Sequence, residues 1–298
     1  MTTTLAAVAA PFGRDLDAAF ARIEQLLAAA RARGVQLLAL PEATLGGYLA
    51  DLGEHGVDAG RVDAGAAGRA DDAVPPGHAL PPALDVDGPE IARLAALAGD
   101  VVVTAGFCES DGARRYNTAV AVTGDGVLGV HRKVHQPLGE HHSYAAGETF
   151  GAFDSPVGRL GMLICYDKAF PEASRTLALD GAEVVVCMSA WPAARTAASP
   201  DLADDRWTHR FDLFDQARAL ENQVVWVSAN QSGTFGSLRF VASAKVVGPG
   251  GEVLATTGVR EGMAVAAVDV PGVLAGARRS MAHLRDRRPE AYGVLAGV

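Results

Sequence analysis

The chain has 298 residues, 49% of them hydrophobic and 20% charged, so it can form one large α/β domain or two ordinary ones, and global disorder is excluded. A formal net charge of -9 argues against nucleic acid and anionic membranes as partners, because phosphate binding needs a basic surface. No apolar run approaches the ~20 residues of a membrane span, and no signal peptide is evident. Cys108, Cys165 and Cys187 lack metal-ligand spacing and fit free thiols in a reducing cytoplasm, where we expect this protein.

The first 40 residues predict a strand, a helix and a second strand. Residues 4–10 and 35–40 are short apolar runs that favour buried strands, and residues 15–33 carry apolar side chains at helical spacing. Such a βαβ unit implies a parallel or mixed sheet covered by helices.

Residues 50–83 differ in composition, since Gly, Ala, Asp and Pro dominate and no apolar periodicity appears. We interpret this stretch as a mobile insertion, with a part in covering the site left open. A helix over 88–98 and strands over 101–108, 116–123, 127–133, 153–155 and 159–164 are expected beyond it.

The second half of the chain also alternates predicted strands and helices. Helices are expected over 168–180 and 205–221, and strands over 183–188, 224–229, 241–247, 253–257 and 263–268, followed by a helix and tail from residue 274. Both halves mix helices with sheet, so we predict an α/β fold: a sandwich of two mixed sheets with helices outside, four layers in all. We treat 1–298 as one domain with a C-terminal tail near 284–298.

Three chemically active residues follow buried strands: Glu42 in LLALPEATLGGY, Lys133 in GVLGVHRKVH, and Cys165 in MLICYDKAFPE. Ends of neighbouring strands are where α/β proteins place ligands, so we expect the three to converge. A carboxylate can take the proton of a thiol, and a lysine with the backbone N–H of Tyr166 can stabilise an oxyanion. Each residue also has a simpler interpretation. Glu42 suits an exposed loop, Lys133 an edge strand, and Cys165 an inert core.

The three stretches, in this order, resemble the motifs of the nitrilase superfamily, the carbon–nitrogen hydrolases that act on non-peptide C–N bonds. The resemblance extends from Leu5 to about Val268 and implies a four-layer α-β-β-α sandwich. It also implies Glu42 as base, Lys133 as oxyanion stabiliser and Cys165 as nucleophile. The family's second glutamate matches Glu140 in HQPLGEHHSY, where the alternative is a solvated loop acid.

The same resemblance suggests the remaining site properties. Residues that fall where the family lines its pocket, or flank the nucleophile, are Tyr48, Tyr166, Trp191 and Asn230; Tyr48 and Trp191 also suit core or rim packing. No metal and no organic cofactor are implied. The expected partner is a small amide or nitrile, and pairing into a homo-oligomer, a dimer or larger, is expected.

The motifs indicate the branch of the family less clearly than they indicate the family itself. Cys165 is followed by Tyr-Asp, which resembles amidase-type members, whereas nitrilases more often carry Trp-Glu there. The segment HRKVHQPLGEHHSYAAGE is more similar to nitrilases. Members that act on amides of small dicarboxylates often carry an arginine where this chain has Ala169. An amidase is therefore predicted, with a nitrilase and an N-carbamoyl amidase as alternatives.

Two other function classes compete. His131, His135, His141 and His142 cluster near Glu140, as in a metal hydrolase, but no HExxH or Cys/His spacing is present. A catalytically silent binding protein on the same fold is the second alternative.

Overall fold

The computed structural model describes residues 2–52 and 80–293. Most of the predicted insertion and the last residues of the predicted tail lie outside this range, so both stay predictions, as does the single domain. The helices are α1 (Leu16–Arg31), α2 (Pro89–Ala98), α3 (Pro171–Leu179), α4 (Arg206–Asn222) and α5 (Val270–Ser280), with short 3₁₀ turns η1 (Glu140–His142), η2 (Cys165–Ala169), η3 (Leu202–Asp204) and η4 (Pro289–Ala291). None of the helices in the described ranges combines the length and the hydropathy that crossing a bilayer requires.

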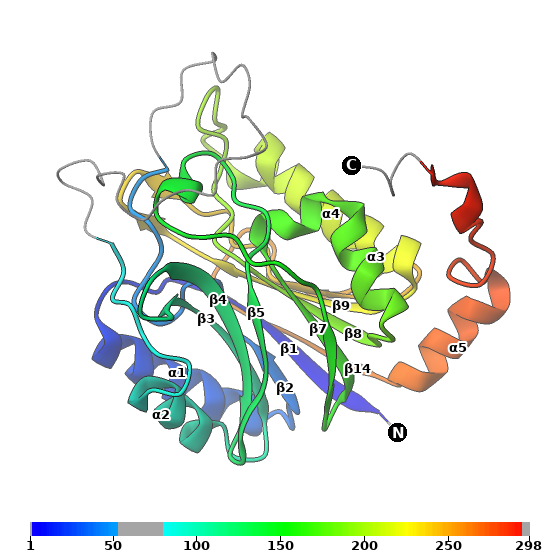
Figure 1. The fold of residues 1–298 in the computed structure, drawn as a ribbon, viewed down its shortest axis with the longest axis horizontal. Coiled ribbons are helices and arrows are strands. Elements are labelled where there is room, and N and C mark those ends of the chain that lie inside the picture. Colours follow the sequence, from blue (N-terminus) through cyan, green and yellow to red (C-terminus); the bar gives the residue numbers. More distant parts are fainter. Residues whose placement is uncertain (1, 53–79, 294–298) are drawn as a thin grey trace.

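One hydrogen-bonded path of strands runs through both halves of the chain, in the order β5-β4-β3-β2-β1-β9-β8-β7-β6 (Figure 1). Off this path β14 pairs with β1, and β12 pairs with β9 and β13, while β10 and β11 form a separate hairpin. The strands are β1 (Thr3–Ala10), β2 (Leu37–Ala39), β3 (Val102–Ser110), β4 (Arg115–Thr123), β5 (Gly126–Arg132), β6 (Ala152–Ser155), β7 (Gly158–Ile164), β8 (Val184–Ser189), β9 (Val225–Gln231), β10 (Thr234–Phe235), β11 (Leu238–Arg239), β12 (Lys245–Val247), β13 (Val253–Thr256) and β14 (Gly262–Val268). The predicted mixed α/β class is therefore confirmed.

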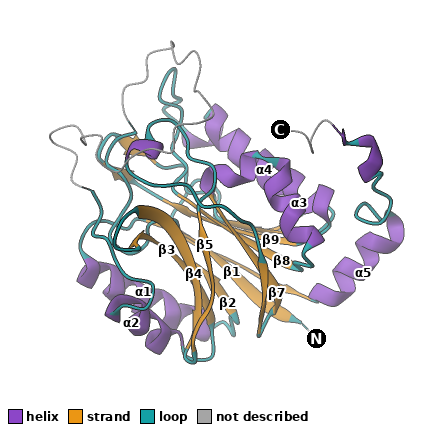
Figure 2. Ribbon diagram, in the orientation of Figure 1, coloured by secondary structure: helices purple, strands orange, loops and turns teal. Residues whose placement is uncertain are grey.

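The core consists of apolar clusters on the two faces of these strands. One cluster joins alternate residues of β1, such as Leu5 and Ala7, with Met162 and Ile164 of β7, so the two halves pack on each other. The other face of β1 packs against α1 and α2, and the outer face of β7 and β8 packs against α3 and α4. Figure 2 shows these two helix pairs on opposite sides of the strands. The count of four layers stays a prediction.

The strand bounds shift from expectation where the backbone leaves the extended conformation. We expected a strand over 241–247, but β12 begins only at Lys245, because Ala242 and Ser243 have positive φ angles of 58° and 54°. The expected helix over 168–180 is two elements, η2 and α3, since Pro171 begins a new helix after Phe170. Helix α5 begins at Val270, four residues before the expected position.

The strand directions bring three carboxyl ends to one edge. Strands β2, β1, β9, β8 and β7 are parallel along the path. Strand β3 is parallel to β2, and two antiparallel steps through β4 return β5 to the same direction. Glu42, Lys133 and Cys165 follow β2, β5 and β7, so all three emerge at the same edge.

Candidate active site

The turn after β2 buries Glu42 completely. Its Oε2 accepts a hydrogen bond from the Ala190 N–H at 2.5 Å, and its carbonyl oxygen accepts one from Gln231 Nε2 at 2.8 Å. The turn lies directly on β3 at Gly106, where a methyl group would come within 2.5 Å of the Ala43 nitrogen. A glycine at that position therefore allows the close approach that places Glu42 over the sheet.

Lys133 connects two buried carboxylates. Its Nζ donates to Glu42 Oε1 at 2.8 Å and to Glu140 Oε2 at 2.7 Å, and none of the three side chains is exposed. Asn117 of β4 supports the arrangement, because its Nδ2 donates at 2.7 Å to Glu42 Oε1 and at 2.7 Å to Glu140 Oε1. The four side chains form one closed network, and Glu140 belongs to it as an internal group, not as a solvated loop acid.

The charged groups in this network shift one another's pKa values. Burial alone would lower the pKa of Lys133, but the carboxylates of Glu140 and Glu42 outweigh it and raise the pKa above its usual value. Burial raises the pKa of the Glu140 carboxyl, and the nearby charge of Glu42 adds to the rise, against the opposing effect of Lys133. Lys133 therefore remains a cation across the neutral range, fixed between two acids.

Cys165 sits at a strained turn between β7 and η2. Its φ angle is 51°, in the left-handed region that costs a non-glycine residue about 1–2 kcal/mol. Two buried side chains hold the turn. Asp167 Oδ2 accepts from the Ile164 N–H at 3.1 Å, and Arg218 of α4 donates to the carbonyl oxygens of Lys168 and Ala169 at 2.8 and 3.0 Å.

The surroundings of the Cys165 thiol favour its neutral form. Burial raises the pKa of the Cys165 thiol well above its usual value, and the charge of Glu42 adds to the rise, although Lys133 opposes it. A neutral thiol beside a carboxylate can transfer its proton at the moment of reaction. The arrangement thus brings a thiol, a carboxylate and a fixed cation close enough to influence one another electrostatically.

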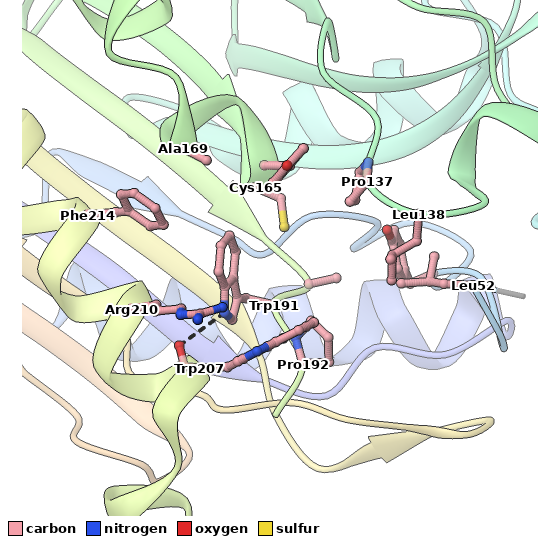
Figure 3. A pocket seen from close by; sticks show the side chains of 13 residues that line it. Leu52, Pro137, Leu138, Cys165, Ala169, Trp191, Pro192, Trp207, Arg210 and Phe214 are labelled. Atoms are coloured by element: carbon pink, nitrogen blue, oxygen red, sulfur yellow. Dashed lines mark hydrogen bonds between the residues drawn. The ribbon is translucent and has the colours of Figure 1, made fainter. Parts of the chain in front are cut away.

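An apolar cavity of about 440 Å³ opens onto Cys165 (Figure 3). Its walls come from the Glu42 loop, the segment before η1, the cysteine turn, the segment after β8, and helix α4. The lining residues are Tyr48, Leu52, Pro137, Leu138, Cys165, Tyr166, Ala169, Ala190, Trp191, Pro192, Trp207, Arg210 and Phe214. A cavity of this size accommodates a small organic molecule.

Of the residues predicted to line the pocket, Tyr48, Tyr166 and Trp191 are in the lining and Asn230 is not. Asn230 is buried at the end of β9, and its Oδ1 accepts from the Trp191 N–H at 2.8 Å. Trp191 also donates from Nε1 to the Trp207 carbonyl oxygen at 3.1 Å. Asn230 therefore holds the aromatic wall from behind, and its role in substrate binding stays a prediction.

Two of the clustered histidines, His131 and His135, contact the Asp167 carboxylate. His131 Nε2 lies 3.0 Å and His135 Nδ1 2.9 Å from the Asp167 carboxylate, and both rings stack on Phe150. Within the described ranges, no three His, Cys, Asp or Glu side chains are grouped as a metal ion would require. The geometry thus gives His131 and His135 a part in supporting the cysteine turn.

Sequence reasoning missed the contribution of α4. Trp207, Arg210 and Phe214 are spaced three and four residues apart, so they occupy one face of the helix, and all three line the cavity. The periodicity of the expected 205–221 helix was a signal for a buried face, but it does not distinguish a face on the core from a face on a cavity. Asn117 lies in the strand predicted over residues 116–123, and no role in the site was expected for it.

Comparison with known proteins identifies the family of this chain. The family described as carbon–nitrogen hydrolase matches residues 4–277. The chain is 30% identical to a nitrilase of Pyrococcus abyssi, covering 93% of each chain, and 32% identical to N-carbamoylputrescine amidase of Arabidopsis thaliana, covering 70% of this chain and 73% of the relative. The fold matches the amidase from Nesterenkonia sp. AN1 with a TM-score of 0.73 at 23% identity, covering 97% and 95% of the two chains. The chain therefore belongs to the carbon–nitrogen hydrolase family of the nitrilase superfamily.

Proposed function

We propose that this protein hydrolyses a small-molecule amide to a carboxylic acid and ammonia through a thioester on Cys165. The observation that carries the proposal is the buried network in which Lys133 joins Glu42 and Glu140, at the sheet edge where Cys165 also emerges. The four-layer arrangement, the cytoplasmic location and the homo-oligomer stay predictions from the same resemblance.

In the first half-reaction, Glu42 takes the thiol proton as Sγ attacks the amide carbon. The negative charge that develops on the carbonyl oxygen is stabilised by the Lys133 ammonium and the backbone N–H of Tyr166. Loss of one such donor typically costs about 3 kcal/mol in the transition state. The C–N bond then breaks, the leaving nitrogen receives the proton held by Glu42, and ammonia departs.

In the second half-reaction, a water molecule attacks the thioester carbon while Glu42 takes a proton from it. Collapse of the intermediate releases the carboxylic acid and returns the proton to the Cys165 sulfur. Glu140 acts as a positioning residue, because it contacts Lys133 and Asn117 and holds the ammonium toward Glu42.

Support comes from the strained cysteine turn and from relatives. A turn of this kind exposes a nucleophile at the end of a strand, and strain of this size persists only where surrounding contacts enforce it. The solved Nesterenkonia amidase was obtained with the acetamide moiety of fluoroacetamide attached to its active-site cysteine. The named relatives also include a nitrilase and an N-carbamoyl amidase, so nitriles and N-carbamoyl compounds are the competing substrates.

Ammonia release from a panel of amides, nitriles and N-carbamoyl compounds tests the proposal, with Cys165→Ala as the control. We expect ammonia from amides with wild type and none above background with the variant. Carbon dioxide released together with ammonia would assign the N-carbamoyl reaction, and turnover of nitriles alone would assign a nitrilase. A wild-type rate in Cys165→Ala would overturn the mechanism.

A further inference from the structure

The cavity next to Cys165 carries one permanent charge among its described lining residues, and that charge is Arg210. The remaining walls are aromatic, aliphatic or small, and no acidic side chain is present in the described lining. A guanidinium in such a setting is well suited to bind a carboxylate, because it is always charged and its planar arrangement of N–H groups matches the two carboxylate oxygens.

Arg210 is held at the cavity by the start of α4. The helix begins at the buried N-cap Asp205, which accepts from the N–H groups of Trp207, Ala194 and Ser199 at 2.8, 3.1 and 3.2 Å. Asp205 thus ties the helix to the segment that follows Trp191. Arg210 lies one turn into this fixed helix, so its position relative to the cavity follows from the fold and not from a loose loop.

Within the described part of the chain, the Arg210 side chain is exposed and has no hydrogen bond, ion pair or ring contact. Its neighbour Arg206, one turn earlier, donates to Thr196 Oγ1 at 3.0 Å and does not line the cavity. The difference matters, because an arginine whose N–H groups already donate to protein oxygens offers fewer donors to a ligand, whereas Arg210 keeps its donors available.

The cavity lined by both Cys165 and Arg210 has a fixed aromatic wall. The Trp191 ring packs against Trp207 and Phe214 with centroid distances of 6.4 and 6.1 Å, and its backbone N–H is held by Asn230. In the view of Figure 3, Trp191 lies between the cysteine sulfur and the Arg210 side chain. An apolar spacer, flat or branched, is the chemistry that such a surface favours.

We propose, on the basis of the proposed function, that the substrate is an amide whose acyl chain carries an apolar spacer and a distal carboxylate, and that Arg210 binds this carboxylate. The scissile amide would lie at Cys165, the spacer on Trp191, and the carboxylate at the cavity mouth. Arg210 also disfavours a substrate with a distal ammonium group, since the described lining offers no acid to receive it. Arg210 is therefore a specificity-determining residue, remote from the reacting bond.

The test uses three amides that differ only in their distal group: the para-carboxy, para-methyl and para-aminomethyl derivatives of phenylpropanamide. Wild-type kcat/KM should be highest for the carboxylate. Arg210→Gln should lower the ratio of carboxy to methyl kcat/KM by about tenfold, mainly through KM, since a hydrogen bond to a charged group at a solvent-facing site is of that order. Arg210→Glu should shift the preference to the aminomethyl compound.

Arg206→Gln is the matched control, because it removes a charge from the same helix outside the cavity, and it should keep the wild-type ratio. An unchanged ratio in both Arg210 variants would overturn the inference. So would failure of wild type to turn over the carboxy compound while other amides of the panel release ammonia. In either case Cys165-dependent ammonia release would leave the proposed function standing. Absence of all such release would instead mean that the proposed function itself is wrong.

Discussion

Lys133 Nζ lies 2.8 Å from Glu42 Oε1, and neither side chain reaches solvent. An ion pair of this kind joins two segments of the fold and fixes a cation whose charge acts on the Cys165 thiol. Removal of one partner leaves buried charge without compensation, which typically costs about 3–5 kcal/mol. Under the proposed mechanism, the pair therefore serves both the fold and the reaction.

Replacement of Lys133 by Met tests this double role. Lys133→Met should lower the free energy of unfolding by about 3–5 kcal/mol, because Glu42 and Glu140 then lose their shared cation. The double variant Lys133→Met/Glu140→Gln should be less destabilised than the sum of its single variants, since it removes one of the stranded charges. Urea unfolding of the four proteins measures both effects. Simple additivity would show that the two residues do not act as a pair.

Glu42→Gln should separate turnover from thiol reactivity. Loss of the base should lower kcat by roughly 10²–10⁴-fold. Burial and the charge of Glu42 together raise the pKa of Cys165, so removal of that charge should move the pH midpoint for alkylation of Cys165 downward. Iodoacetamide kinetics followed by peptide mass analysis gives this midpoint. A variant that keeps wild-type turnover, or one whose alkylation midpoint rises, would contradict the assigned roles.

Asn230 should act through Trp191. Asn230→Ala removes the acceptor of the Trp191 N–H, and a buried donor without a partner costs about 1–3 kcal/mol. We expect a lower free energy of unfolding and a higher KM for amides, with a smaller change in kcat. Ser228→Ala is the matched control on the same strand, because the Ser228 hydroxyl is buried without a hydrogen-bond partner in the described residues. Equal effects of the two substitutions would refute the positioning role.

Asp167 should make the free energy of unfolding depend on pH in the acidic range. Burial alone would raise the pKa of Asp167, but hydrogen bonds from His131 and His135 lower it well below its usual value. The contribution of the Asp167 carboxylate to the free energy of unfolding is fully present above the unfolded-state pKa of about 3.9. It is lost as the pH falls through the lower folded-state pKa. Asp167→Asn should therefore cost about 3 kcal/mol at neutral pH, and the difference from wild type should shrink below about pH 4.

Denaturant unfolding at several pH values provides the measurement. The control is Asp180→Asn, since Asp180 is an exposed partner of Arg159 at 3.3 Å and should affect stability far less. A pH-independent difference between wild type and Asp167→Asn would show that Asp167 is not held as an anion by the two histidines.

Short local sequence motifs were enough to predict which three residues meet at the edge of the sheet. Glu42, Lys133 and Cys165 each follow an apolar run, and the parallel directions of those runs bring them to one edge of the sheet. The local patterns did not reveal what depends on distant segments. The face of α4 that carries Trp207 and Arg210 has the same periodicity as a core-facing helix, and only the fold shows that a cavity lies beneath it. The support that Asn230 gives to Trp191 depends on a contact across 39 positions of sequence.

Unusual backbone conformations could not be predicted from the local sequence either. The turns at Ala43 and Cys165 both have positive φ angles, although neither residue favours that region. Such strain is imposed by surrounding contacts, for example the approach of the Glu42 turn to Gly106, and no local propensity signals it.

The most direct test of the mechanism is to locate the acyl group on the enzyme during turnover. Wild-type protein is mixed with an amide from the panel, quenched in acid within one turnover and measured as intact protein and as peptides. We predict a mass increase equal to the amide minus ammonia, confined to the peptide that contains Cys165 and absent from those with Cys108 or Cys187. An acyl group on another residue, or steady ammonia release by Cys165→Ala, would contradict the account.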